Sequence, residues 1–146
     1  MENIVNNLNV FLSDLNVFYR KLQNYHWNVY GNDFFVLHSK LEEYYNKVNE
    51  QIDEVAEHIL MLGKTPLGTM QDYLNTTCIV EAKNEKINAC DVFENVIKDL
   101  GTLLTKVKDI KKEADDQSLY STSALMDGYI SEYMKDLWML NQSKEN

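Results

Sequence analysis

Proline and glycine are scarce in this chain of 146 residues, which contains one proline and five glycines. An all-β protein needs a turn every several residues, and turns rely on these two residue types. The scarcity therefore excludes a β-rich fold and favours a few long helices. Hydrophobic residues make up 45% of the chain, which is enough for a folded core. The length suits one compact domain over residues 1–146.

Cysteine and long apolar runs are also in short supply. The two cysteines, Cys78 and Cys90, lie too far apart for a CxxC redox or zinc motif. No stretch approaches the roughly 20 apolar residues that a membrane helix needs. Met1–Val10 lacks the basic residues and apolar core of a signal peptide. We therefore expect a reduced, cytoplasmic protein that does not enter a membrane.

Basic residues are fewer than acidic residues in this chain. It carries 14 Lys and Arg against 23 Asp and Glu, which gives a formal net charge of -9. Nucleic acid and anionic membranes bear phosphates that repel such a chain, whereas cations are attracted to it. The charge therefore argues against nonspecific binding to either surface.

Apolar residues recur at steps of three and four along four segments, which is the pattern of amphipathic helices. The segments run from Leu8 to Val29, from Phe34 to Leu62, from Ile87 to Ile110 and from Leu119 to Leu140. The simplest arrangement of four such helices is an all-α four-helix bundle. The link between the second and third segments is long, which suits a crossover rather than a tight hairpin.

Capping preferences predict where these helices begin and end. Asn32 or Asp33 would cap the second helix, and Gly63 would end it. Ser118 would cap the last helix. A short helix starting near Thr69 would lie within the crossover.

Two of the three histidines flank the break between the first two helices. His26 precedes Gly31 and His38 follows it, each on an apolar stripe. If these helices pack antiparallel, both imidazoles lie near the same end and form half of a metal site. The plainer interpretation of one buried histidine is a hydrogen-bonded core residue. Two histidines that face a shared turn favour a metal site instead.

Four ionisable side chains follow one narrow ribbon of the second helix. Glu42 lies four residues after His38, and Glu57 lies four residues after Asp53. At about 100° per residue, Glu42 and Asp53 fall within roughly 20° of each other around the helix axis. A solvated acidic face is the commoner explanation of such acids. This ribbon, however, borders the apolar stripe.

One helix cannot gather these groups around one ion. His38 and Asp53 are separated by about 22 Å of axial rise, whereas a metal reaches its ligands at about 2 Å. Two antiparallel copies of the second helix across a two-fold axis would set His38 of one copy opposite Asp53 of the other. Each site would take His26 and His38 from one chain and Asp53 and Glu57 from its partner. Imidazole with carboxylate suits iron, zinc or manganese, and spacing does not choose among them.

A di-iron centre inside a single bundle would need Glu-x-x-His pairs on two helices. The residues three positions before His26, His38 and His58 are Gln23, Phe35 and Val55. No histidine completes the pair, and the HExxH motif is also missing. The sequence therefore predicts that no di-iron centre lies within one subunit.

Several motifs together resemble the Dps family of mini-ferritins. They are Asn24-Tyr25-His26-Trp27-Asn28-Val29-Tyr30-Gly31, Phe34, Leu37-His38, Ile52-Asp53-Glu54-Val55-Ala56-Glu57, Leu62-Gly63-Lys64-Thr65-Pro66 and Trp138-Met139-Leu140. The likeness covers nearly the whole chain, and the combination of His-Trp-Asn-Val with Asp-x-x-x-Glu is highly specific. The resemblance implies a ferritin-like four-helix bundle with a short extra helix in the central crossover, assembled into a hollow dodecamer.

The resemblance also implies iron storage and detoxification. A ferroxidase of this family oxidises Fe(II) to Fe(III), mainly with hydrogen peroxide, stores the ferric mineral inside its cage and protects DNA from oxidative damage. Its sites lie at two-fold interfaces, with two iron ions in each. By position, His26, His38, Asp53 and Glu57 would bind iron, and Glu42 would assist directly or through water.

The same resemblance implies roles for the two tryptophans. Trp27 would lie close to the iron site as a packed aromatic, with a secondary role as a sacrificial electron donor. Trp138 would serve packing, with a similar minor redox role as the alternative.

The chain departs from the family pattern at two positions. The residue after Glu57 is often arginine in the family but is His58 here, which puts a helix-surface ion pair in doubt. Ala124 stands near a position where the family often carries an acid. The acid-lined pore at the three-fold axis would then be built differently, with Asp115 and Asp116 as candidates.

Binding to DNA needs separate evidence, because family members that bind DNA directly often use basic tails. Met1–Asn7 holds no Lys or Arg, and Asn141–Asn146 holds only Lys144. The run Lys106, Lys108, Lys111 and Lys112 is more typical of the solvated, dipole-compensating end of a helix. We expect weak or no direct DNA binding. The alternative function is a nucleoid-associated, DNA-compacting protein with minor ferroxidase activity.

Overall fold

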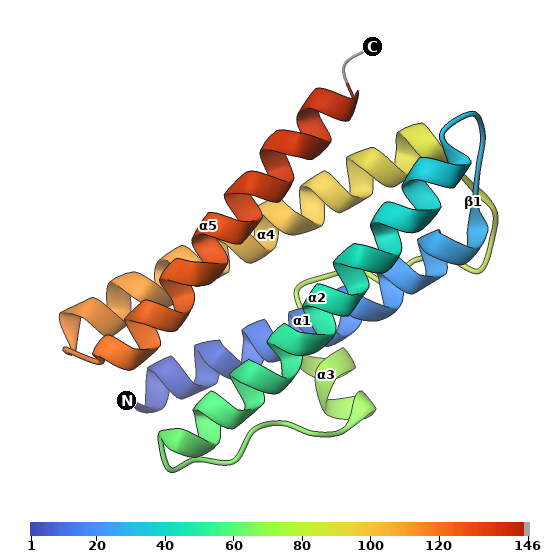
Figure 1. Cartoon of the computed structure of the whole chain (residues 1–146). Coiled ribbons are helices and arrows are strands. Elements are labelled where there is room, and N and C mark those ends of the chain that lie inside the picture. The colour runs from blue at the N-terminus through green and yellow to red at the C-terminus, as the bar shows by residue number, and fades with distance from the viewer. Residues whose placement is uncertain (145–146) are drawn as a thin grey trace.

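The computed structural model describes residues 1–144 of the chain. Its long helices are α1 (Glu2–Asn28), α2 (Phe34–Met61), α4 (Ala89–Asp116) and α5 (Tyr120–Lys144). A short helix, α3 (Met70–Thr76), lies in the link between α2 and α4. Figure 1 shows two helical hairpins, α1 with α2 and α4 with α5, that lie alongside each other. The predicted all-α bundle with a short crossover helix is confirmed.

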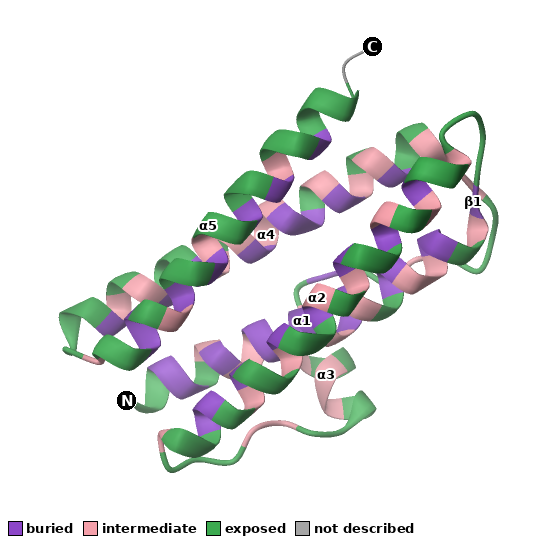
Figure 2. Cartoon of the chain, in the orientation of Figure 1, coloured by how far each residue is buried: buried purple, intermediate pink, exposed green. Residues whose placement is uncertain are grey.

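The bundle forms because each long helix buries one apolar stripe, as Figure 2 shows. Phe11 and Phe18 of α1, Leu41 of α2, Leu103 of α4 and Tyr133 of α5 are almost completely buried. Burying an aliphatic or aromatic side chain contributes about 1.5–3 kcal/mol, so this core dominates the stability. The opposite faces stay polar, and none of the helices within residues 1–144 is long and apolar enough to cross a membrane.

Two very short strands connect the hairpins. β1 (Val29–Tyr30) pairs in parallel with β2 (Ile87–Asn88), with Val29 opposite Ile87 and Tyr30 opposite Asn88. The sequence pattern placed Val29 and Ile87 within helices, and both assignments are wrong. Extended backbone at these positions ties the start of α4 to the turn between α1 and α2.

Side-chain caps fix the starts of two helices. The Asn88 side chain accepts a hydrogen bond from the Asp91 amide at 2.9 Å at the start of α4. Thr69 accepts one from the Asp72 amide at 3.2 Å at the start of α3, where the sequence predicted that helix to begin. Asp33 precedes α2 as expected, although its side chain forms no capping bond.

The sequence predicted the end of α2 correctly but not the residue that caps α5. Gly63 follows α2 with φ of +81°, and the Lys64 amide donates to the Ile59 carbonyl at 3.2 Å. This is the glycine-dependent helix stop that the sequence predicted. Ser118, in contrast, does not cap α5. It adopts φ of +57°, its amide donates to the Asp115 carbonyl at 3.1 Å, and α5 begins at Tyr120.

The link from α3 to α4, residues 77–88, is here called the crossover segment. It is fastened to α1 by buried charged side chains. The Asp14 carboxylate accepts hydrogen bonds from the Thr77 hydroxyl and the Cys78 amide, each at 2.7 Å. Lys21 donates to the Val80 carbonyl at 2.7 Å. These bonds hold the segment along the bundle rather than leaving it as a free loop.

Candidate metal centre

The two histidines at the α1–α2 turn lie against each other. The rings of His26 and His38 stack with centroids 3.7 Å apart and planes 11° apart. His26 Nδ1 lies 2.6 Å from the backbone carbonyl of His38, and His38 Nδ1 lies 2.7 Å from the carbonyl of His26. The packing of α1 against α2 brings together these residues from either side of Gly31, as the sequence predicted.

This reciprocal bonding decides which ring nitrogens are free. A backbone carbonyl only accepts hydrogen bonds, so both Nδ1 atoms must carry a proton and donate. In a neutral imidazole the other nitrogen, Nε2, then keeps its lone pair. Histidines that bind metals usually donate their second N–H to a carbonyl or carboxylate in this way. His26 and His38 therefore present two Nε2 lone pairs for a metal.

Glu42 joins the two histidines within the same chain. Its Oε1 atom lies 3.7 Å from His26 Nε2, and its side chain is about half exposed. The carboxylate therefore faces the ring nitrogen that the backbone leaves free. Imidazole and carboxylate together form a donor set suited to Fe(II), Zn(II) or Mn(II).

Aromatic side chains enclose the histidine pair. The Phe34 ring stacks on His38 at 5.0 Å, and the edge of Tyr45 meets His26 at 5.5 Å. Sequence reasoning did not identify these neighbours. Helical spacing would have found them, because Phe34 and Tyr45 lie four residues before and seven residues after His38. Their rings limit the orientation of the imidazoles.

Asp53 and Glu57 lie on α2 but away from the histidines. Both are exposed on the helix surface. Within residues 1–144, no group of three or more His, Cys, Asp or Glu side chains of one chain is arranged to hold a metal ion. A single chain places Glu42 beside the stacked His26 and His38, which does not by itself make a metal site, and leaves Asp53 and Glu57 on the helix surface.

Two buried tyrosines of α5 hydrogen-bond to polar side chains of α2 in the interior of the bundle. The Tyr133 hydroxyl donates to Gln51 at 2.8 Å, and the Tyr129 hydroxyl donates to Glu54 at 2.9 Å. Burial and the neighbouring Glu54 raise the pKa of Tyr129 well above its usual value, so its hydroxyl stays protonated. These bonds join α5 to α2 across the interior of the bundle.

His58 is a core residue and not part of a helix-surface ion pair. Its side chain is 4% exposed, and Nε2 lies 2.8 Å from the Thr122 hydroxyl of α5. Burial lowers the pKa of His58 below its ordinary value. The sequence analysis considered this position for its effect on the helix surface, whereas the side chain faces inward.

Neither tryptophan is packed in the isolated chain. Trp27 is 59% exposed, and the Arg20 guanidinium lies 6.0 Å from its ring. Trp138 is 60% exposed, so the expectation that it serves packing is not met within one chain. Both rings are available for contact with another molecule.

Of the two candidate pore residues, Asp115 already has partners. Its carboxylate accepts a short hydrogen bond of 2.5 Å from the Ser123 hydroxyl and lies 3.8 Å from the Lys111 ammonium. Asp116 is exposed at the end of α4. These contacts favour a structural role for Asp115 at the α4–α5 turn.

Comparisons with known proteins agree with this architecture. A family model described as a ferritin-like domain matches residues 5–145. The "DNA protection during starvation protein 2" of Bacillus anthracis is 38% identical over 140 residues, covering 94% of this chain and 93% of that protein. The crystal structure of antigen TpF1 from Treponema pallidum has a TM-score of 0.97 at 31% identity, covering 99% of this chain and 93% of that one.

A third comparison connects the fold to metal chemistry. A Dps protein from Vibrio cholerae O1, described as a member of a broad superfamily of ferritin-like diiron-carboxylate proteins, has a TM-score of 0.93 at 37% identity. The match covers 97% of this chain and 88% of that one. With the bundle, the crossover helix and the similarity along nearly its whole length, the chain belongs to the Dps family of ferritin-like proteins.

Proposed function

We propose that this protein is a ferroxidase and iron store that protects DNA. Two copies would share each site, oxidise Fe(II) to Fe(III) preferentially with hydrogen peroxide, and keep the ferric mineral inside a dodecameric cage. One observation carries the proposal. His26 and His38 expose two lone pairs side by side, while the acids that would complete a coordination sphere lie elsewhere on the same helix.

The surface of α2 supports a two-fold arrangement. Antiparallel α2 helices with His38 opposite Asp53 would also place the start of α2 in one chain, residue 34, opposite residue 57 near the end of α2 in the other. Two exposed apolar patches lie at these ends. The hairpin patch is Trp27, Tyr30, Phe35 and Val36, and the helix-end patch is Leu60 and Met61. One symmetric contact would therefore cover the hairpin patch of each chain with the helix-end patch of the other.

The residues of the shared site have distinct chemical roles. His26 and His38 would bind iron through Nε2, with their orientation fixed by the backbone carbonyls. Asp53 and Glu57 of the other chain would supply carboxylate oxygens and offset the charge of the ions. Glu42, facing His26, would bind directly or through water.

Two ferrous ions in one site match the electron demand of the oxidant. Each Fe(II) gives one electron, and hydrogen peroxide takes two electrons and two protons to form two waters. Peroxide is then reduced without releasing a hydroxyl radical. DNA would be protected because both reagents of radical formation are consumed, which is consistent with the names of relatives such as the Bacillus anthracis protein. The net charge of -9 favours this route over protection by binding DNA.

The first test measures the reaction itself. Fe(II) is added anaerobically to the assembled protein, followed by hydrogen peroxide, and ferric absorbance is recorded. A variant with both His26→Ala and His38→Ala should oxidise Fe(II) at least about tenfold more slowly, because it loses two metal–nitrogen bonds. Lys108→Ala, on the exposed face of α4 and away from α2, is the control and should keep the original rate. An unchanged rate in the histidine variant would remove these residues from the mechanism.

A second test asks whether the site is shared between chains. One partner carries His26→Ala with His38→Ala, and the other carries Asp53→Ala with Glu57→Ala. Each variant alone should be inactive. Co-assembly should restore about a quarter of the activity, because half of random pairs are mixed and each mixed pair has one intact site of two. A mixture as inactive as its parents would show that both halves belong to the same chain.

A further inference from the structure

Two pairs of side-chain rings form successive layers where α1 packs against α2. His26 and His38 form the first layer, with ring centroids 3.7 Å apart. Tyr19 and Tyr45 form the second, because Tyr19 lies seven residues before His26 on α1 and Tyr45 lies seven residues after His38 on α2. Seven residues are about two helical turns, so each tyrosine shares a helix face with its histidine. The tyrosine layer is therefore next to the candidate metal ligands.

Tyr45 connects the two layers. Its ring meets the His26 ring edge to face, with centroids 5.5 Å apart and planes at 81°. Tyr19 meets Tyr45 in the same manner, at 5.9 Å and 87°. Both distances lie in the range of direct contact between aromatic rings, about 4.5–7 Å. A continuous path of ring contacts thus runs from His26 to Tyr45, and Tyr19 holds the Tyr45 ring in this position.

Tyr45 is also the neighbour of the histidines that gives up an electron most readily. Within residues 1–144 two other aromatic rings contact the histidine pair, Phe34 on His38 and Tyr45 on His26. A phenylalanine ring is hard to oxidise, whereas a phenol can lose one electron together with its O–H proton. Glu42, which faces His26, is a carboxylate and therefore no reductant. The ring in contact with His26 is thus the one suited to electron donation.

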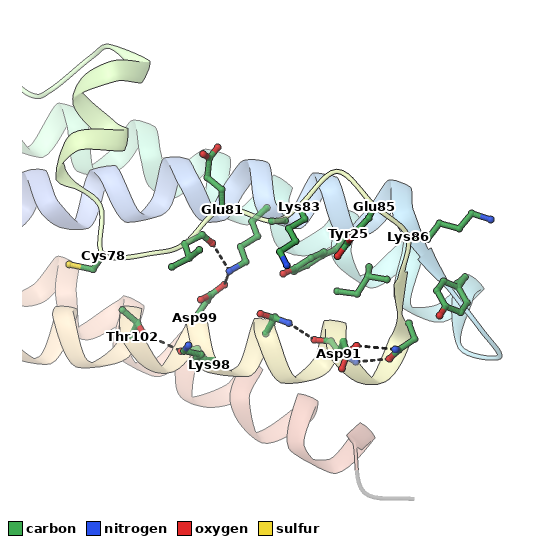
Figure 3. A pocket seen from close by; sticks show the side chains of 17 residues that line it. Tyr25, Cys78, Glu81, Lys83, Glu85, Lys86, Asp91, Lys98, Asp99 and Thr102 are labelled. Carbon is green, nitrogen blue, oxygen red and sulfur yellow. Dashed lines mark hydrogen bonds and ion pairs between the residues drawn. The ribbon is translucent and has the colours of Figure 1, made fainter.

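The easily oxidised residues on either side of His26 in the sequence make no such contact. The helical step of about 100° per residue turns Tyr25 toward a cleft between α1, the crossover segment and α4 (Figure 3). Trp27 is 59% exposed, and its ring lies near the Arg20 guanidinium rather than against either histidine. Tyr45, in contrast, is half-buried. The ring contacts therefore favour Tyr45 over Trp27 as an electron donor.

A donor at this position matters when a site is only half filled. This inference rests on the proposed ferroxidase function, in which two Fe(II) ions give hydrogen peroxide the two electrons that it needs. A site with one Fe(II) supplies only one electron. Cleavage of the O–O bond by one electron leaves a hydroxyl radical, which is the product that the proposed reaction avoids. A second electron from a nearby side chain would complete the reduction to water.

We propose that Tyr45 supplies the second electron when a site holds a single Fe(II). Fe(II) is oxidised to Fe(III) and the Tyr45 phenol to a phenoxyl radical, while the O–O bond of hydrogen peroxide breaks. The phenol proton and one proton from solvent go to the two peroxide oxygens, which leave as two waters. A further Fe(II) then gives one electron, and solvent gives one proton, to restore the phenol. The complete cycle consumes two Fe(II) for each peroxide, as in the filled site.

The test uses the assembled, iron-free protein and electron paramagnetic resonance. One Fe(II) per chain is bound anaerobically, one hydrogen peroxide per chain is added, and the sample is frozen rapidly. A tyrosyl radical is expected. Its signal should be lost in Tyr45→Phe, which keeps the ring and removes the hydroxyl, and should remain in the control Tyr120→Phe, at an exposed tyrosine of α5. With two Fe(II) per chain, the original protein should give no radical, because the second ion supplies the electron.

A signal that persists in Tyr45→Phe would overturn the proposal, as would a tryptophanyl signal that is lost in Trp27→Phe. Ferric absorbance without a tyrosyl radical at one Fe(II) per chain would overturn this inference alone, whereas no ferric absorbance at two Fe(II) per chain would overturn the proposed function. Thermal unfolding checks the fold of each variant. A nitroso spin trap added to the original protein needs no variant, and peptide mass spectrometry should locate its adduct on Tyr45. An adduct on a different residue would contradict the proposal.

Discussion

His26 and His38 hold each other in place through the backbone, each Nδ1 donating to the carbonyl of the other residue. The sequence placed both residues near one turn, since they flank Gly31 on apolar stripes. It did not reveal the stacked rings or the reciprocal bonds. Those depend on how closely α1 and α2 approach, which is a property of the packed hairpin. The structure thus supplies the orientation of the ligands that spacing alone left open.

Protonation of the single residue His58 makes the free energy of unfolding depend on pH. Its pKa is lowered by burial in the folded protein, whereas in the unfolded chain it titrates near about 6.5. The unfolded state therefore binds the proton more readily. The contribution of neutral His58 is fully present above about pH 6.5 and decreases as the pH falls from there toward the lower folded-state pKa.

We predict that His58→Gln reduces this acid sensitivity. Glutamine has no proton to gain near neutral pH and can still bond the Thr122 hydroxyl. The measurement is the midpoint of thermal unfolding at about pH 7.5 and about pH 5.5, on either side of the ordinary histidine pKa. The original protein should lose more stability between these two pH values than the variant does. Equal losses would show that His58 protonation costs no folding energy.

At the scale of elements, the end of a helix was predicted correctly where the conformation or side chain of one residue fixes it. Gly63 and Thr69 mark the end of α2 and the start of α3, because a positive φ and a hydroxyl cap are local requirements. Ile87 and Val29 were misassigned because a two-residue parallel pairing joins segments far apart in the sequence. No local pattern indicates such a contact.

We predict that Gly63→Ala destabilises the protein by about 1 kcal/mol, since an L-residue is strained at positive φ. Gly63 has φ of +81°, and a methyl group added there would meet no atom within 4 Å, so backbone strain is the only expected cost. Gly68→Ala is the control, because it also has open space but no positive φ. Urea unfolding of both variants measures the difference. Similar stabilities would argue against strain at the end of α2.

At the scale of the whole molecule, a single chain has an incomplete candidate metal site and exposed apolar surface. Within residues 1–144 the histidines lack a full set of acids, and two apolar patches at opposite ends of α2 remain exposed. A symmetric partner would correct both deficiencies at once. The family match makes such an assembly the expected form, and the subunit number is a proposal.

We predict that Met61→Asp prevents this assembly. Met61 is 73% exposed in the helix-end patch, and a buried unpaired carboxylate there would cost several kcal/mol per interface. Light scattering should show particles smaller than those of the original protein, with loss of ferroxidase activity. Val80→Asp is the control, because Val80 is also apolar and 76% exposed but lies outside both patches. Unchanged particle size for Met61→Asp would rule out this interface.

The sequence by itself determined the helical class, the end of α2 and the start of α3, because these depend on periodicity and local backbone preference. That the chain is one domain stays a prediction from its length. The tertiary structure decided which way the histidine nitrogens point, that His58 faces inward and that Lys21 of α1 pairs with Asp99 of α4. These features arise only when segments distant in the chain pack together, since contact and burial are properties of the fold rather than of any local stretch.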